Sequence, residues 1–304
     1  MKKIFNLIIF FVLFSSCNNA VVEDKRDTPK TGTINISVDE SFKPVIEQQL
    51  MVYKSSFPNT NIIATYKSEA DCLKDLQSDS TRMVIVGRGL TKEEDAYYYS
   101  KLAYHPLFAP LAMDAVTLIV SNNATDTVYS LNRIKAILNG TINKPAVVDG
   151  NNATSLVRYL KDTLLNKAAF GKNVTAAAGS EAVVKYIANH PEAVGFVSST
   201  WIGNKLDTAQ VSLTKNIKSC LVECINCPQK DTYAKPAQST IMWRKYPLVR
   251  RLYYILKENY TGLGTGFMNF MSLERGQLIF SRANIVPVKM YFGIRSGTLK
   301  EQKQ

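Results

Sequence analysis

Several residue types on which enzymes and metal sites depend are scarce in this sequence. Its 304 residues include two histidines, two tryptophans and five cysteines. His105 precedes a proline in an aromatic-rich loop, and His190 lies in a predicted helix-ending turn, so both are expected to be structural. Nucleophile elbows, Walker loops and zinc-protease signatures are absent as well. The sequence therefore supports no enzyme, and it predicts no cofactor and no metal.

The few cysteines favour a disulfide. After Cys17 and Cys72, the other three form a C-x3-C-x2-C pattern at Cys220, Cys224 and Cys227. Exported proteins use cysteines mainly in disulfides. A structural zinc site needs four ligands, and Cys72, distant in sequence, would have to be the fourth. We expect one disulfide among the three clustered cysteines, where it would staple a loop, and keep zinc as the alternative.

Long hydrophobic runs are also missing beyond the N-terminus. A basic start at Lys2 and Lys3, an apolar run over residues 8–14 and small residues before Cys17 are typical of a secretory signal. A membrane span needs about 20 apolar residues. The end of the signal resembles the lipobox of bacterial lipoproteins, with an ordinary cleaved signal as the alternative. We expect export, a lipid anchor on Cys17 at the periplasmic face of a membrane, and a flexible tether over residues 18–32.

Basic residues outnumber acidic residues in this sequence. With 37 basic and 25 acidic residues, the chain carries a formal charge of +12. Such a charge is compatible with solubility or with attraction to anions. Nucleic acid is not expected as a partner, because no basic-aromatic motif accompanies the charge.

Predicted strands and helices alternate along the chain, which is typical of an α/β fold with mainly parallel sheets. Strands are expected at residues 33–38, 62–66, 83–86, 115–121, 146–149 and 193–198. Helices are expected at residues 42–57, 70–77, 91–100, 131–138, 154–165, 181–189, 247–260 and 264–273. In such folds, ligands bind beyond the carboxyl ends of the strands.

Four loops that follow predicted strands carry groups suited to an anion. They cover residues 39–42, 67–69, 87–91 and 149–155, and each places hydroxyls, free backbone N–H groups or an arginine at the start of a helix. Unpaired N–H groups and the positive end of the helix dipole bind anions, and arginine adds a bidentate clamp. Each loop alone could be simple helix capping. Their recurrence in four loops favours an anion site.

The order of several segments resembles the phosphate-binding proteins of bacterial ABC importers, which have the type II periplasmic binding fold. The likeness rests on MVIVGRGLTKEE (83–94), MDAVTLIVSN (113–122), LNRIKAILNG (131–140), AVGFV (193–197), the Tyr246-Pro247-Leu248 and Leu252-Tyr253-Tyr254 stretches, and FMNFMSLERGQLIFSRANIVP (267–287). It spans nearly the whole mature chain, and the variants are most similar to lipoproteins of the Bacteroidetes type.

The resemblance implies two α/β lobes around a hinged cleft. It places the first lobe at residues 33–114 with a return segment at 235–295, the second lobe at 115–234, and a polar tail at 296–304. The crossings near Asp114 and near residues 233–236 would form the hinge. The implied activity is capture of phosphate by a monomeric lipoprotein for an ABC permease.

The resemblance also implies ligand-binding residues. Ser41 with Phe42 and Ser68 match the first and second loops of the family, and Arg88 matches the third, where Gly87 replaces a serine. The family's helix-start donors correspond to Asn152, Thr154 and Ser155. The usual arginine before that helix is missing, since Val147 and Val148 occupy the region, so Arg158 is expected to supply the charge.

Asp114 matches a carboxylate of the family's crossover strand. An acceptor in a donating pocket favours phosphate, because monohydrogen phosphate can donate its proton whereas sulfate would leave the acceptor unpaired. Asp39, Glu40 and Asp149 are rival acceptors, and Asp114 could equally be a surface or capping carboxylate. Two other functions stay open: a lipoprotein that senses or binds another oxyanion, and a structural surface lipoprotein with a degenerate cleft.

Overall fold

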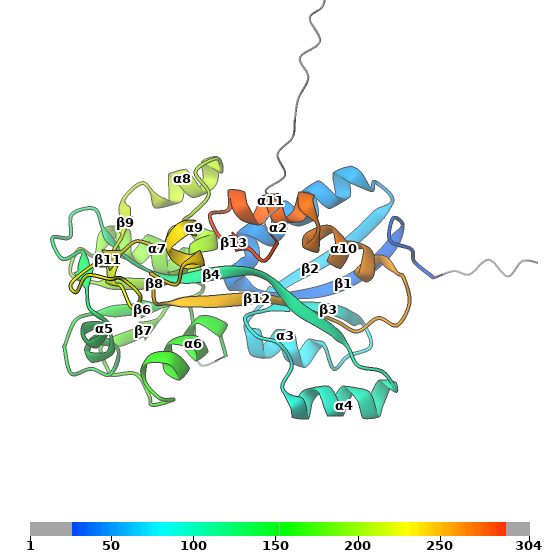
Figure 1. The fold of residues 1–304 in the computed structure, drawn as a ribbon, viewed down its shortest axis with the longest axis horizontal. Helices are drawn as coiled ribbons and strands as arrows, with labels where there is room; N and C mark the ends of the chain where they lie inside the picture. Colours follow the sequence, from blue (N-terminus) through cyan, green and yellow to red (C-terminus); the bar gives the residue numbers. More distant parts are fainter. Residues whose placement is uncertain (1–25, 152, 290–304) are drawn as a thin grey trace, which may run out of the picture.

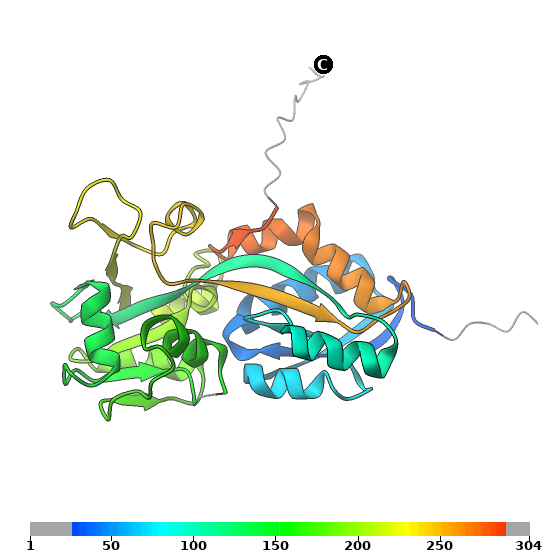
Figure 2. The same ribbon diagram turned by 60° about the horizontal axis from the view of Figure 1, so that its bottom comes forward.

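The computed structural model describes residues 26–151 and 153–289. The predicted signal, its Cys17, Asn152 and the polar tail lie outside the described residues. The described chain forms two α/β lobes joined by long strands (Figures 1 and 2). One sheet runs through both lobes in the order β2-β1-β3-β12-β4-β8-β6-β7, with β9 and β13 also paired to β4.

In the first lobe, helices cover both faces of the sheet. Its strands are β1 (Gly32–Asp39), β2 (Thr60–Lys67), β3 (Thr81–Val86) and β13 (Val286–Pro287). Its helices are the 3-10 turn η2 (Glu40–Phe42), α2 (Lys43–Ser56), α3 (Glu69–Asp75), α4 (Lys92–Leu102), α10 (Leu263–Ser272) and α11 (Glu274–Arg282). Apolar side chains of α2, α10 and α11 pack on one face, and those of α3 and α4 pack on the other.

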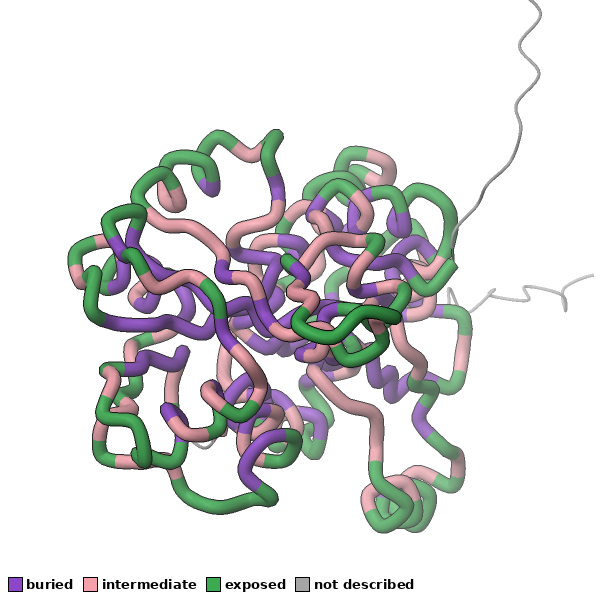
Figure 3. Tube along the Cα trace, turned by 60° about the vertical axis from the view of Figure 1, so that its left-hand side comes forward, coloured by how far each residue is buried: buried purple, intermediate pink, exposed green. Residues whose placement is uncertain are grey.

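The second lobe repeats this arrangement. Its strands are β5 (Val128–Tyr129), β6 (Ala146–Val148), β7 (Val174–Ala176), β8 (Val194–Ser198), β9 (Ile217–Ser219), β10 (Leu221–Glu223) and β11 (Tyr233–Ala234). Its helices are α5 (Leu131–Leu138), α6 (Ser155–Leu164), α7 (Ser180–Asn189), the 3-10 turn η3 (Ser199–Trp201), α8 (Thr208–Thr214) and α9 (Gln238–Met242). Helices α5 and α6 pack on one face and α7 on the other. Figure 3 shows the buried residues running through the middle of the molecule.

Two antiparallel strands connect the lobes. Strand β4 (Leu107–Ser121) pairs with β12 (Val249–Leu256) up to Ala115, and with β8 and β9 beyond it. The prediction of a helix over residues 247–260 is wrong, because β12 fills the gap between β3 and β4 and bonds to both. The sheet is therefore mixed: the predicted parallel pairing holds for β1 with β2 and β3 and for β6 with β7 and β8.

Part of the predicted tether belongs to the folded body. The carboxylate of Asp27 accepts hydrogen bonds from the backbone N–H of Leu263 and the hydroxyl of Tyr260, and it pairs with Arg82. No helix within residues 26–151 and 153–289 is long and apolar enough to cross a membrane.

The clustered cysteines lie near the β10–β11 hairpin. A disulfide joins Cys224 to Cys227 and closes a short loop between the two strands. Cys220 and Cys72 are instead free thiols, each fully buried. No group of three or more metal-ligating side chains lies within the described residues.

Candidate ligand site between the lobes

Polar side chains from both lobes meet where the carboxyl ends of β1 and β6 face each other. The hydroxyl of Ser41, in the first lobe, donates to Oδ2 of Asp149 at 3.1 Å. The hydroxyl of Thr154, in the second lobe, donates to Oδ1 of the same carboxylate at 2.9 Å. We call Asp39, Ser41, Asp114, Asp149, Thr154, Ser155 and Arg250 the interlobe cluster. One carboxylate thus holds two hydroxyls from opposite lobes together.

A buried arginine that the sequence analysis missed stands at the centre of this cluster. The side chain of Arg250 is 2% exposed. Its Nε donates to Oδ2 of Asp114 at 2.9 Å, and its Nη1 donates to Oγ of Ser155 at 2.8 Å. The guanidinium carbon lies 4.8 Å from the ring centre of Phe42. Arg250 faces Asp114 directly across the β12–β4 pair, so the ion pair lies on the strands that connect the lobes.

Asp114 and Asp39 differ in how fully their oxygens are used. Besides Arg250, Asp114 accepts from the hydroxyl of Ser198 at 2.8 Å and from the backbone N–H of Ser199 at 3.1 Å, so both of its oxygens are engaged within the protein. In Asp39, Oδ1 accepts from the backbone N–H of Ser41, whereas the buried Oδ2 has no partner. Of the two carboxylates, only Asp39 therefore has an oxygen that is free to accept a hydrogen bond from a ligand.

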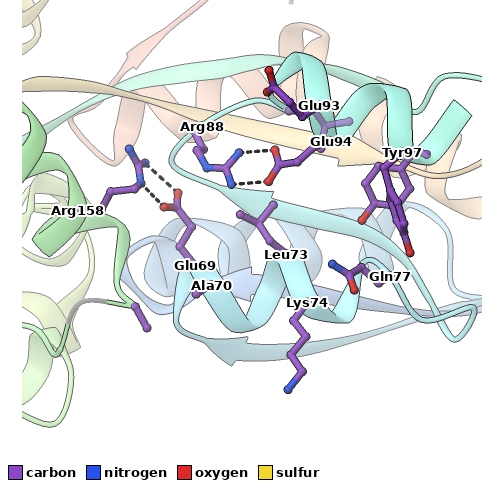
Figure 4. A pocket seen from close by; sticks show the side chains of 13 residues that line it. Glu69, Ala70, Leu73, Lys74, Gln77, Arg88, Glu93, Glu94, Tyr97 and Arg158 are labelled. Carbon is purple, nitrogen blue, oxygen red and sulfur yellow. Dashed lines mark hydrogen bonds and ion pairs between the residues drawn. The ribbon is translucent and has the colours of Figure 1, made fainter.

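The two arginines that the sequence analysis expected to bind the ligand form ion pairs with glutamates instead (Figure 4). Arg158 forms a two-point ion pair with Glu69 of the first lobe, with Nη2 3.1 Å from Oε1. Arg88 forms a similar pair with Glu94, at 2.6 and 2.7 Å. All four side chains line a pocket of about 590 Å³ between α3, α4 and the start of α6. Both guanidiniums are committed to carboxylates, and Arg158 links the lobes.

Helix capping accounts for one predicted donor. Ser68 is the N-cap of α3: its hydroxyl accepts from the backbone N–H of Asp71 and donates to the Asp71 carboxylate. Thr154 also caps a helix, α6, but it reaches Asp149 in addition. Ser41 precedes α2 but does not cap it; Asp39 instead accepts from the N–H of Ser41 at the start of η2.

The structure therefore brings some predicted residues together and separates others. Ser41, Phe42, Asp114, Thr154 and Ser155 meet around Arg250. Ser68 and Arg88 are occupied elsewhere, and Asn152 lies outside the described residues. Arg250 has no distinguishing signal in the sequence, because its segment is predicted to be a helix, in which consecutive arginines are typical of a solvated face.

Four carboxyl groups in and beside the cluster have a raised pKa. Burial raises the pKa of Asp39 to about 6, although the charge of Arg250 opposes the shift. Burial and the nearby Asp149 raise the pKa of Glu40 to about 7. The Glu40 carboxylate accepts hydrogen bonds from the backbone N–H and hydroxyl of Ser180 in the second lobe. Burial likewise raises the pKa of Asp114 and of Asp149.

These shifts predict an unusual dependence of stability on pH. A carboxyl whose pKa is higher in the folded chain than its ordinary value of 3.8 or 4.5 stabilises the fold at low pH, and this stabilisation is lost as the pH rises toward 6 or 7. The free energy of unfolding should therefore be greater at pH 5 than at pH 7.5. The difference is on the order of 2 kcal/mol, because a tenfold change in proton affinity corresponds to about 1.4 kcal/mol.

Urea unfolding at several pH values measures this dependence. Glu40→Gln should flatten the profile between pH 5 and 7.5, whereas Glu47→Gln, at an exposed carboxylate on α2, should leave it unchanged. A free energy of unfolding that rises steadily over this interval in the unsubstituted chain would contradict the assignment.

Comparison with known proteins assigns the chain to a family. The family model of the PBP superfamily domain matches residues 24–274. The chain belongs to this superfamily. It is 23% identical over 296 residues to the phosphate-binding protein PstS of Pseudomonas aeruginosa, with 88% of this chain and 87% of that protein covered.

Solved structures agree with the superfamily assignment. A protein from Clostridium perfringens, described as a phosphate ABC transporter substrate-binding protein with bound phosphate, matches with a TM-score of 0.69 and 19% identity, covering 85% of this chain and all of that one. An ABC-type phosphate transport receptor from Vibrio cholerae matches with a TM-score of 0.61 and 16% identity, covering 84% of this chain and all of that one. The predicted two-lobed periplasmic binding protein fold is confirmed.

Proposed function

We propose that this member of the PBP superfamily is a binding protein, not an enzyme, that captures phosphate between its lobes for an ABC importer. The names of its relatives support this proposal, since both the PstS of P. aeruginosa and the C. perfringens protein are phosphate binders by description. The chemistry between the lobes supports it independently.

The observation that carries the proposal is the convergence of donors on one carboxylate. Ser41 and Thr154, from opposite lobes, both donate to Asp149, and Arg250 and Ser155 stand beside them. A carboxylate presents oxygens to hydroxyl donors much as phosphate does. Arg250 supplies a charge-assisted donor, and the N-terminus of α6, which Thr154 caps, adds the positive end of a helix dipole. This arrangement supports an oxyanion site in which the Asp149 carboxylate takes the place of the ligand.

The spare acceptor favours a protonated oxyanion over sulfate. The unpaired Oδ2 of Asp39 can accept the proton of monohydrogen phosphate, whereas sulfate has none to donate. We therefore assign the discriminating role to Asp39 rather than to Asp114, whose oxygens are already engaged.

The cellular setting remains a proposal from the sequence. It comprises export, a lipid anchor at Cys17 facing the periplasm, a monomeric state and delivery to a permease. The lobe boundaries that the resemblance implies, 33–114, 115–234 and 235–295, belong to the same proposal with one change at the return crossing. Ile241, Tyr246 and Leu248 pack into the core of the second lobe. This packing supports a return of the chain to the first lobe at β12, and not at residues 233–236.

Calorimetric titration of the purified chain tests the function. We expect heat of binding with phosphate and none with sulfate. Binding of molybdate alone would indicate a carrier or sensor of another oxyanion, and the absence of binding with all three anions would overturn the proposal.

A further inference from the structure

Two of the unpaired polar atoms in the protein interior lie in the interlobe cluster. Among the described residues, four buried side-chain atoms have no hydrogen-bond partner: Asp39 Oδ2, Gln49 Oε1, Asn173 Oδ1 and Arg250 Nη2. A buried donor without a partner costs about 1–3 kcal/mol, and more when it is charged. A guanidinium that retains such a donor next to a predicted anion site has the geometry of a ligand-binding group.

The other two nitrogens of this guanidinium fix its direction. Asp114 holds Nε from β4, and Ser155 holds Nη1 from the first turn of α6. The ring of Phe42 lies against the guanidinium on the side of the first lobe. Contacts from both lobes and from a connecting strand therefore orient the plane of Arg250, and Nη2 is left to serve a ligand.

The remaining arginines near the cluster are less suitable. Arg158 and Arg88 each donate two hydrogen bonds to a glutamate, and both line the pocket between α3, α4 and the start of α6. Val147 and Val148, where the family resemblance expects an arginine, are buried apolar residues of β6. The segment 146–154, which leads into α6, therefore contains no arginine.

We infer that Arg250 is the guanidinium that binds the captured oxyanion, through Nη2, and that the connecting strand β12 supplies the charge that the α6 loop lacks. This inference rests on the proposed function and names a residue of its site. Because Arg250 and Asp114 face each other on the two strands that join the lobes, the anion would be held by these strands and by the hydroxyls of Ser41 and Thr154, which it would take over from Asp149. Binding would then be coupled directly to the angle between the lobes.

The test removes the buried pair as a unit and measures binding of radiolabelled inorganic phosphate by equilibrium dialysis. Asp114→Asn/Arg250→Gln eliminates both charges, which avoids leaving one of them unpaired. We expect it to weaken phosphate binding roughly 50-fold or more, the loss of a charge-assisted bond. The matched control is Asp126→Asn/Arg133→Gln, a partly exposed pair on the second lobe with two hydrogen bonds of 2.8 and 2.7 Å. We expect it to bind phosphate with unchanged affinity.

A second variant covers the case in which the double variant does not fold. Arg250→Lys keeps the charge but loses the planar fork, and roughly tenfold weaker binding is expected. Phosphate binding within threefold of the unsubstituted chain, in the folded double variant or in Arg250→Lys, would overturn the inference while leaving the proposed function intact. If the unsubstituted chain binds no phosphate, the proposed function fails and this inference fails with it.

Discussion

Asp114→Ala is expected to lower the free energy of unfolding by about 3 kcal/mol, measured by urea denaturation at neutral pH. The substitution leaves the fully buried guanidinium of Arg250 without its ion-pair partner, and breaking a buried pair costs about 3–5 kcal/mol. The lower end applies because Asp39 and Asp149 still act on the same guanidinium. The substitution also removes the acceptor that holds Ser198 and the N–H of Ser199 at the start of η3.

Two controls separate the buried charge from the other losses. Asp126→Ala removes a partly exposed partner of Arg133 and should cost less than about 1 kcal/mol. Asp114→Ala/Arg250→Met removes both charges and should recover much of the lost stability. If Asp114→Ala costs no more than Asp126→Ala, Arg250 is not buried against Asp114 in solution.

Glu69→Ala is expected to lower the free energy of unfolding by about 2 kcal/mol and to open the lobes. Glu69 is 3% exposed; it accepts from the backbone N–H of Gly87 in its own lobe and from the guanidinium of Arg158 in the other. Removing it leaves both donors without this partner, at about 1–3 kcal/mol for a buried group. Small-angle scattering of the ligand-free chain should show a larger radius of gyration.

Asp162 provides the matched control for this substitution. It also contacts Arg158, at 3.6 Å, but its side chain is 41% exposed and lies in the same helix. Asp162→Ala should leave both the stability and the radius of gyration unchanged, because exposed ion pairs contribute little. An unaltered radius in Glu69→Ala would mean that other contacts are sufficient to hold the lobes together.

Local sequence signals predicted much of the fold. The helix over residues 131–138 has the predicted bounds, and the capping box of Thr91 and Glu94 is formed at the start of α4. Both depend on neighbouring residues only. Strand β12 could not be predicted in this way, since its place is decided by β3 and β4, which are more than a hundred residues earlier in the chain. Helix α11 was not predicted either.

In the candidate site, too, the residues marked by local sequence signals could be predicted, and those placed by long-range contacts could not. Ser41, Thr154 and Ser155 follow strands whose carboxyl ends meet, so their positions could be inferred from the alternation of strands and helices. Arg250 enters the site from the start of β12, and an arginine there has no local feature that marks it as buried. The ion pairs that occupy Arg88 and Arg158 likewise depend on distances within the folded chain.

The position of β12 also governs how the chain acquires its structure. The strand lies between β3 and β4, yet it follows both of them by more than a hundred residues in the chain. Until residues 249–256 are available, β3 and β4 each keep an open edge and the two halves of the sheet are not joined. Such long-range pairing slows folding. A nascent chain therefore stays incompletely folded until residues 249–256 have emerged, although most strands of both lobes precede them.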